Sequence, residues 1–142
     1  MPRYRELGSR EARIAIDACL DPLIHRNKAA TVAVADRHGE LIALWRMDKA
    51  NLPSVAIASN KAYTAARVRG FSGDLGRKAR EDGSDVHYHG DARYVGWDGG
   101  AAILLGGECL GAIGVSGLSG EEDLEIANIG VAAVLAHLSI SA

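Results

Sequence analysis

The stretch from Gly106 to Gly117 constrains the fold more than any other part of the sequence. Two adjacent glycines, Gly106 and Gly107, precede an apolar run that leads into a capped helix. Glycine adopts positive φ angles at no steric cost, and two-residue hairpin turns favour residues of this kind. We therefore expect residues 101–105 and 108–115 to form antiparallel strands joined by this turn.

Local patterns predict a second hairpin and an N-terminal helix. Residues 31–35 and 40–47 have β-type patterns, and the turn at residues 36–39 separates them. Apolar residues at helical spacing predict an amphipathic helix over residues 9–27. Pro22 lies inside this helix and is expected to kink or divide it.

Two further helices and one long loop complete the prediction. Residues 54–69 are rich in alanine, so this helix can pack unusually close to whatever covers it. Ser119 with Glu122 three residues later matches a capping box and marks the start of the last helix. Residues 70–97 contain many glycines and charges without a clear period, which indicates either a long functional loop or a partly mobile excursion of the chain.

The order of these elements predicts the fold class. A helix, two strands, a helix, a loop, two or three strands and a helix indicate an α+β layer fold with an antiparallel sheet. The 142 residues, of which 48% are hydrophobic, are enough for one domain, residues 1–142, whose core needs no disulfide or structural metal. Cys19 and Cys109 lie in apolar contexts and are interpreted as buried hydrophobes rather than a disulfide or metal pair.

Composition excludes several classes of partner. The net charge of −2 with interspersed signs lacks the basic footprint of a nucleic-acid-binding protein. No apolar run approaches the ~20 residues that a membrane-spanning helix requires. The charged N-terminal residues lack the apolar core of a signal peptide, so we expect a cytoplasmic protein.

Several short motifs occur in order along the chain: residues 32–36 with Gly39, residues 46–50, residues 61–65, Gly99-Gly100, and residues 111–117 with Asp123 and Gly130. Together they resemble the GlcG/HbpS-like haem-binding family, which includes the C-terminal domain of PduO-type proteins. The resemblance implies a profilin-like fold with a five-stranded antiparallel sheet flanked by helices. It also implies homo-oligomers and, as in some members, binding of haem or related tetrapyrroles.

The segment from Asp85 to Asp91 is the best candidate for a polar site. In an extended chain, Asp85, His87, His89 and Asp91 would project from one face. The Cα atoms of His87 and His89 would then lie roughly 7 Å apart, close enough to bind one metal ion together with ligands from elsewhere. Three interpretations stay open: a solvated loop, a metal or haem ligand set, and acid/base or substrate contact.

Five polar residues in the family motifs are candidates for binding a ligand. Arg46 and Asp48 either form a simple ion pair, or Arg46 holds a carboxylate through its planar fork of donors. Lys61 and Thr64, one helical turn apart, belong either to a solvated face or to an anion pocket. Ser116 completes the candidate set, although its surroundings do not reproduce the Gly-x-Ser-x-Gly elbow of a serine hydrolase.

These observations support more than one function. The first hypothesis is a small-molecule binding protein for haem or another planar acidic ligand, on which aromatic residues such as Tyr63, Tyr88 and Tyr94 could stack. The alternative is a cofactor-independent or metal-assisted catabolic enzyme. It would be an isomerase, hydrolase or lyase that acts on a small oxygenated carboxylate with His87 or His89 as acid or base. A third hypothesis is an assembly or sensor module.

Overall fold

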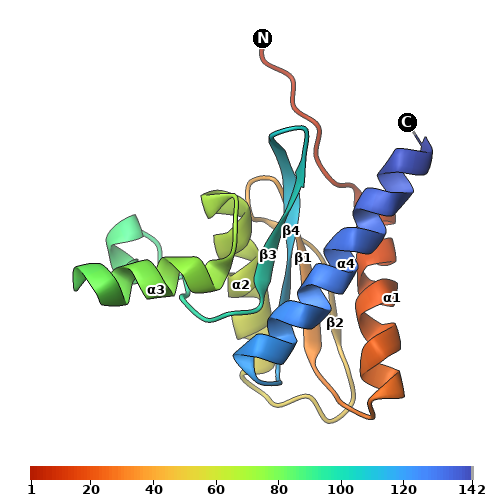
Figure 1. Cartoon of the computed structure of the whole chain (residues 1–142), viewed down its shortest axis with the longest axis horizontal. Helices are drawn as coiled ribbons and strands as arrows, with labels where there is room; N and C mark the ends of the chain where they lie inside the picture. Colours follow the sequence, from red (N-terminus) through yellow and green to blue (C-terminus); the bar gives the residue numbers. More distant parts are fainter. Residues whose placement is uncertain (142) are drawn as a thin grey trace.

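The computed structural model describes residues 1–141 and shows one antiparallel sheet between two layers of helices (Figure 1). The sheet order is β2-β1-β4-β3. Helices α1 and α4 cover one face of the sheet, and α2 covers the other. In chain order the elements are α1 (Ser9–His25), β1 (Thr31–Asp36), β2 (Leu41–Arg46), α2 (Ser54–Val68), α3 (Ser72–Asp82), the 3-10 helix η1 (Val86–His89), β3 (Gly100–Leu105), β4 (Glu108–Ser116) and α4 (Gly120–Ser141).

The two central strands, β1 and β4, are buried on both faces. Val32 and Val34 of β1 belong to the larger core beneath α1 and α4, whereas Ala33 and Ala35 pack against α2. A Cβ atom added at Gly114 of β4 would overlap the carbonyl oxygen of Ala58 in α2. The prediction that the alanine-rich helix packs unusually close to its neighbour is therefore confirmed.

Both predicted hairpins are confirmed. Gly106 and Gly107, with φ angles of 58° and 80°, join β3 to β4. Asp36 shapes the turn between β1 and β2, because its Oδ1 accepts hydrogen bonds from the backbone N–H groups of His38 and Glu40 at 2.8 and 3.1 Å. The Asp36 side chain thus serves as the hydrogen-bond acceptor for these two N–H groups of the turn.

The helix ends also follow local signals. The backbone N–H of Glu122 donates to Ser119 Oγ at 3.2 Å, which confirms Ser119 as the cap of α4. The reciprocal bond of the predicted capping box is not formed within residues 1–141, because the Glu122 carboxylate accepts from Arg26 and Lys28 instead. Helix α1 runs through Pro22 without division, contrary to one of the predicted outcomes. Pro22 removes one backbone N–H donor from the last turn of α1, and the helix ends three residues later at His25.

Two expectations for the middle of the chain are wrong. The sheet has four strands rather than five within residues 1–141, and a single antiparallel bridge between Phe71 and Ala101 extends it beyond β3. The predicted long loop at residues 70–97 contains α3 and η1. The pattern of apolar residues did not predict helix α3, because Gly73 and Gly76 occupy its packed face, where larger apolar residues normally indicate a helix.

Two further properties bear on the expectations from composition. Both cysteines are free and buried, and burial raises the pKa of the Cys19 thiol to about 12. Among the described residues, no helix has the length and apolar character needed to span a bilayer.

Candidate functional site

A groove lies between the C-terminal end of α2, helix α3 and η1, and we call it the α3 groove. Its volume is about 600 Å³. Apolar and aromatic side chains, including those of Val68, Phe71, Leu75 and Tyr88, form much of its lining. Small-molecule sites are typically concave, mostly apolar and of this size, with a few polar groups that orient the ligand.

Helix α3 forms one wall of the groove because one end of it is held to the body of the protein. A Cβ atom added at Gly76 would overlap the carbonyl oxygen of Gly96, so two backbones meet there. Arg77 Nη1 donates to Asp98 Oδ1 at 3.0 Å. Ser72 Oγ donates to the carbonyl oxygen of Trp97 at 2.6 Å. Beyond these contacts, the C-terminal half of α3 projects from the molecule (Figure 1).

The 3-10 helix η1 forms the opposite wall of the groove. We expected an extended chain for residues 85–91, and η1 shows that this expectation is wrong. Asp85 caps η1, because its Oδ1 accepts a hydrogen bond from the backbone N–H of His87 at 2.9 Å. Gly90 ends it with a φ angle of 86°. With three residues per turn, residues two apart do not share a face. The prediction that the two aspartates and two histidines project from one face is therefore wrong.

The two histidines have different surroundings. His89 lines the α3 groove, and its ring packs on Tyr94 with centroids 5.0 Å apart. His87 does not line the groove; its Nδ1 lies 3.1 Å from Asp85 Oδ1 on the exposed surface. Among the described residues, no group of three or more His, Cys, Asp or Glu side chains is arranged to hold a metal ion. The metal and acid/base roles of both histidines stay predictions.

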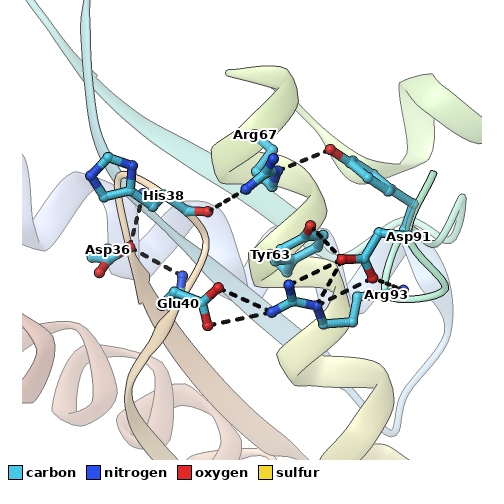
Figure 2. Close-up of polar contacts among 8 residues, drawn as sticks. Asp36, His38, Glu40, Tyr63, Arg67, Asp91 and Arg93 are labelled. Carbon is cyan, nitrogen blue, oxygen red and sulfur yellow. Dashed lines mark hydrogen bonds and ion pairs between the residues drawn. The ribbon is translucent and has the colours of Figure 1, made fainter. Parts of the chain in front are cut away.

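The ring of His89 contacts Tyr94, which belongs to a network of charged and aromatic side chains. This network joins three separate segments of the chain (Figure 2). This Asp91 network consists of Glu40, Tyr63, Arg67, Asp91, Arg93 and Tyr94. Arg93 donates through Nη2 to Asp91 at 3.0 Å and through Nη1 to Glu40 at 3.1 Å. Tyr63 Oη donates to Asp91 Oδ2 at 3.0 Å, and the Arg93 guanidinium lies 4.0 Å from the Tyr63 ring centroid.

The second half of the Asp91 network centres on Tyr94, which is 8% exposed. Arg67 Nε donates to Tyr94 Oη at 3.0 Å, and Arg67 Nη1 donates to the carbonyl oxygen of His38 at 3.2 Å. The rings of Tyr63 and Tyr94 meet edge to face, with centroids 5.2 Å apart. The network therefore ties the segment after η1 to both α2 and the turn between β1 and β2.

Electrostatics keep Asp91 ionised. Hydrogen bonds from the Arg93 side chain, and then from its backbone, lower the pKa of Asp91 to about 2. Burial, followed by the hydrogen bond to Asp91, raises the pKa of Tyr63. At neutral pH the network contains a carboxylate that accepts from a neutral phenol and a charged guanidinium.

The structure assigns Lys61 and Thr64 to interior contacts. The Lys61 side chain is 3% exposed, and its Nζ donates to Asp123 Oδ2 at 3.0 Å and to the carbonyl oxygen of Val115 at 2.8 Å. Thr64 Oγ1 accepts from the backbone N–H of Val95 at 3.0 Å. The solvated-face interpretation is wrong because helix packing buries both side chains. Neither lines the α3 groove, and their ligand-binding role stays a prediction.

The other candidate residues also lie outside the groove. Arg46 and Asp48 are exposed, and the expected ion pair between them is not formed within the described residues. Ser116 is 6% exposed at the end of β4, where it pairs with Thr31. The structure does not bring these three residues together with His89 in one cavity. Their ligand-binding roles stay predictions.

Sequence reasoning missed Lys78 and Phe71 of the groove and Arg93 of the network. Lys78 belongs to a cluster of basic residues at positions 67–80 that a solvated face would also explain. The aromatic expectation was partly informative, because Tyr88 lines the groove while Tyr63 and Tyr94 lie behind it. An aspartate two residues before an arginine, as in Asp91 and Arg93, is the local signal that could have indicated the ion pair.

Comparisons with known proteins identify a family and several relatives of this chain. A family model described as "Haem degrading protein HbpS-like" matches residues 7–132. The corrinoid adenosyltransferase PduO of Salmonella typhimurium is 31% identical over 105 residues, which cover 72% of this chain and 31% of that protein. The chain thus spans about a third of the length of the PduO relatives that it matches.

Two other comparisons cover more than three quarters of both chains. Protein GlcG of Escherichia coli K12 is 33% identical over 116 residues, which cover 78% of this chain and 81% of GlcG. A crystal structure of a PduOC:haem complex is 27% identical and aligns with a TM-score of 0.81. That alignment covers 90% of this chain and 94% of the PduOC chain.

Proposed function

The chain belongs to the HbpS-like family, and from this premise we propose that it binds haem, or a related planar acidic molecule, in the α3 groove. The observation that carries the proposal is the groove itself, which combines a volume of about 600 Å³ with aromatic walls and one imidazole. The structure of the PduOC:haem complex, a protein of the same fold at 27% identity, supports the choice of haem as the first ligand to test.

His89 is the residue that we propose as the ligand to the iron. Within the described residues its ring nitrogens make no hydrogen bond, and the ring lines the groove. Neutral imidazole is a common axial ligand of haem iron. Bound haem would supply a redox-active iron, and the chain would supply the axial nitrogen and the apolar walls.

The charges around the groove favour one orientation of an acidic ligand. Lys78 provides a cation in the lining. Two of the lining carboxylates are engaged, since Asp74 Oδ1 lies 2.6 Å from Arg77 Nη2 and Asp85 pairs with His87. Asp82 has no ion-pair partner among the described residues and would repel a carboxylate. We therefore expect the carboxylates of the ligand to lie toward Lys78 and away from Asp82.

A pair of titrations tests the proposal. Haemin should give a saturable Soret shift, and metal-free protoporphyrin IX should bind with a change in its fluorescence. His89→Ala should abolish the axial-ligand signature of haemin while leaving protoporphyrin IX binding nearly unchanged, because the walls remain. His25→Ala is the matched control, since His25 is an exposed imidazole at the end of α1.

The outcomes are distinct. If neither porphyrin binds the wild-type protein, the proposed function is wrong. If both porphyrins bind but His89→Ala leaves the haemin spectrum unchanged, the axial role of His89 is wrong and the groove assignment needs another ligand. The homo-oligomeric state that the family resemblance implies stays a prediction, which sedimentation velocity would measure in the presence and absence of haemin.

A further inference from the structure

The orientation of the His89 side chain depends on a neighbour outside the α3 groove. η1 is short, and glycines with positive φ angles flank it, Gly83 at 69° and Gly90 at 86°. Neither glycine would meet another atom within 4 Å if it carried a Cβ, so no neighbouring atom packs against these two positions. Since the imidazole makes no hydrogen bond within the described residues, its ring contact with Tyr94 is what restrains it.

Tyr94 is itself fixed from two sides. Its hydroxyl accepts from Arg67 Nε at 3.0 Å, and its ring meets the Tyr63 ring at 65°. Arg67 is in turn anchored on the carbonyl oxygen of His38 in the turn between β1 and β2. A side chain that is 8% exposed and held in this way has little rotamer freedom.

The backbone that carries Tyr94 is also held. The N–H of Val95 donates to Thr64 Oγ1, and Asp91 and Arg93 connect the same segment to Tyr63 and Glu40. The position of Tyr94 is therefore set by α2 and the β1–β2 turn rather than by the groove walls. The ring contact with Tyr94 therefore connects the His89 imidazole to α2 and to the β1–β2 turn.

From this geometry we infer that Tyr94, held by Arg67, is a positioning residue that sets the orientation of the His89 imidazole in the α3 groove. The consequence for ligand affinity rests on the proposed function, whereas the orientation of the ring in the ligand-free protein does not. A site whose iron ligand is oriented before binding loses less side-chain freedom when the ligand arrives.

NMR of the ligand-free protein tests the inference directly. The ring current of Tyr94 should displace the His89 ring-proton resonances, and Tyr94→Leu should return them to the values of a solvated histidine. Tyr94→Phe keeps the ring but loses the hydrogen bond from Arg67, so it should give an intermediate displacement. Arg67→Gln should resemble Tyr94→Phe. Trp45→Leu is the control, because Trp45 is an exposed aromatic residue of β2 that belongs neither to the lining of the α3 groove nor to the Asp91 network.

Ligand titrations extend the test. Tyr94→Leu should weaken haemin binding roughly 2- to 10-fold, the range that one aromatic contact supplies. It should leave the affinity for metal-free protoporphyrin IX within error, because that molecule does not use the imidazole. A merely structural role for Tyr94 would weaken the binding of both porphyrins equally.

Each outcome decides the inference. Unchanged His89 resonances in a folded Tyr94→Leu protein would overturn it, whatever haemin does. Displaced resonances in a protein whose wild type binds no porphyrin would uphold the positioning role and remove the proposed function. If Tyr94→Leu does not fold, the resonances in Tyr94→Phe and Arg67→Gln decide, and unchanged values in both would overturn the inference.

Discussion

Replacing Lys61 by methionine should destabilise the protein far more than the loss of a surface ion pair would. The Lys61 and Asp123 side chains are each 3% exposed. Methionine fills a similar volume but leaves the Asp123 carboxylate with one described hydrogen bond, from the backbone N–H of Leu118 at 3.1 Å. Removing one partner of a buried ion pair typically costs about 3–5 kcal/mol, because an uncompensated charge stays buried.

The matched control is Lys28→Met. Lys28 Nζ lies 2.6 Å from Glu122 Oε1, but the Lys28 side chain is 47% exposed. An exposed pair is worth about 0–1 kcal/mol. We therefore expect urea unfolding to separate the two variants by about 2–5 kcal/mol. The double variant Lys61→Met/Asp123→Asn should regain much of the loss, because it removes the charge and keeps an acceptor for Leu118.

The pH dependence provides a second check. Burial raises the pKa of Asp123, and Lys61 opposes that effect. Without Lys61 the pKa of Asp123 should rise further. A group whose pKa is higher in the folded than in the unfolded state stabilises the fold at pH values below its unfolded pKa, about 3.9 for Asp. This stabilisation is lost as the pH rises through the pKa of the folded state. The stability gap between wild type and Lys61→Met should thus be largest at neutral pH and narrow toward pH 4. A gap below about 1 kcal/mol at pH 7 would refute the reasoning.

Three further predictions concern the site. Asp91→Asn should lower the melting temperature at pH 7. Since the pKa of Asp91 is lowered to about 2, the ionised carboxylate stabilises the fold above pH 4, and this stabilisation is lost toward pH 2. The melting temperatures of the variant and the wild type should therefore converge in acid. Gly76→Ala should push α3 off Gly96, which hydrogen exchange of α3 amides should report as faster exchange. Gly70→Ala should change that exchange little, because an added Cβ would meet the Val68 carbonyl oxygen at 3.9 Å, an ordinary contact distance. Lys78→Gln should weaken haemin binding roughly 2- to 5-fold and Asp82→Asn should strengthen it, while Lys49→Gln, an exposed lysine outside the groove, should do neither; equal titration curves for all three would contradict the charge argument.

Local signals in the sequence were enough to predict most of the fold. The glycine pair at 106–107, the aspartate turn after Asp36 and the cap at Ser119 act within a few residues, so a sequence pattern contains the whole interaction. The family resemblance added the haem hypothesis but also a fifth strand that is not formed. The order of the elements allowed four or five strands, and the resemblance favoured five.

The site was harder to predict because tertiary contacts decide it. Lys61 looks like a surface residue on its own helix, and only the packing of α4 against the sheet brings Asp123 to its Nζ. The alternation around His87 suggested an extended chain, whereas the Asp85 cap and Gly90 close a tight turn. The imidazole that lines the groove could be named from sequence, but its contact with Tyr94 could not.

The two ends of the segment that carries α3 and η1 lie side by side. The chain leaves the sheet at Phe71, which bridges to Ala101, and returns at Trp97, whose carbonyl oxygen accepts from Ser72. Joining two nearby points with a chain of different length costs little loop-closure entropy. The segment between these points can therefore vary in length and sequence during evolution while the sheet that supports it stays the same. Such variation would change what the protein recognises.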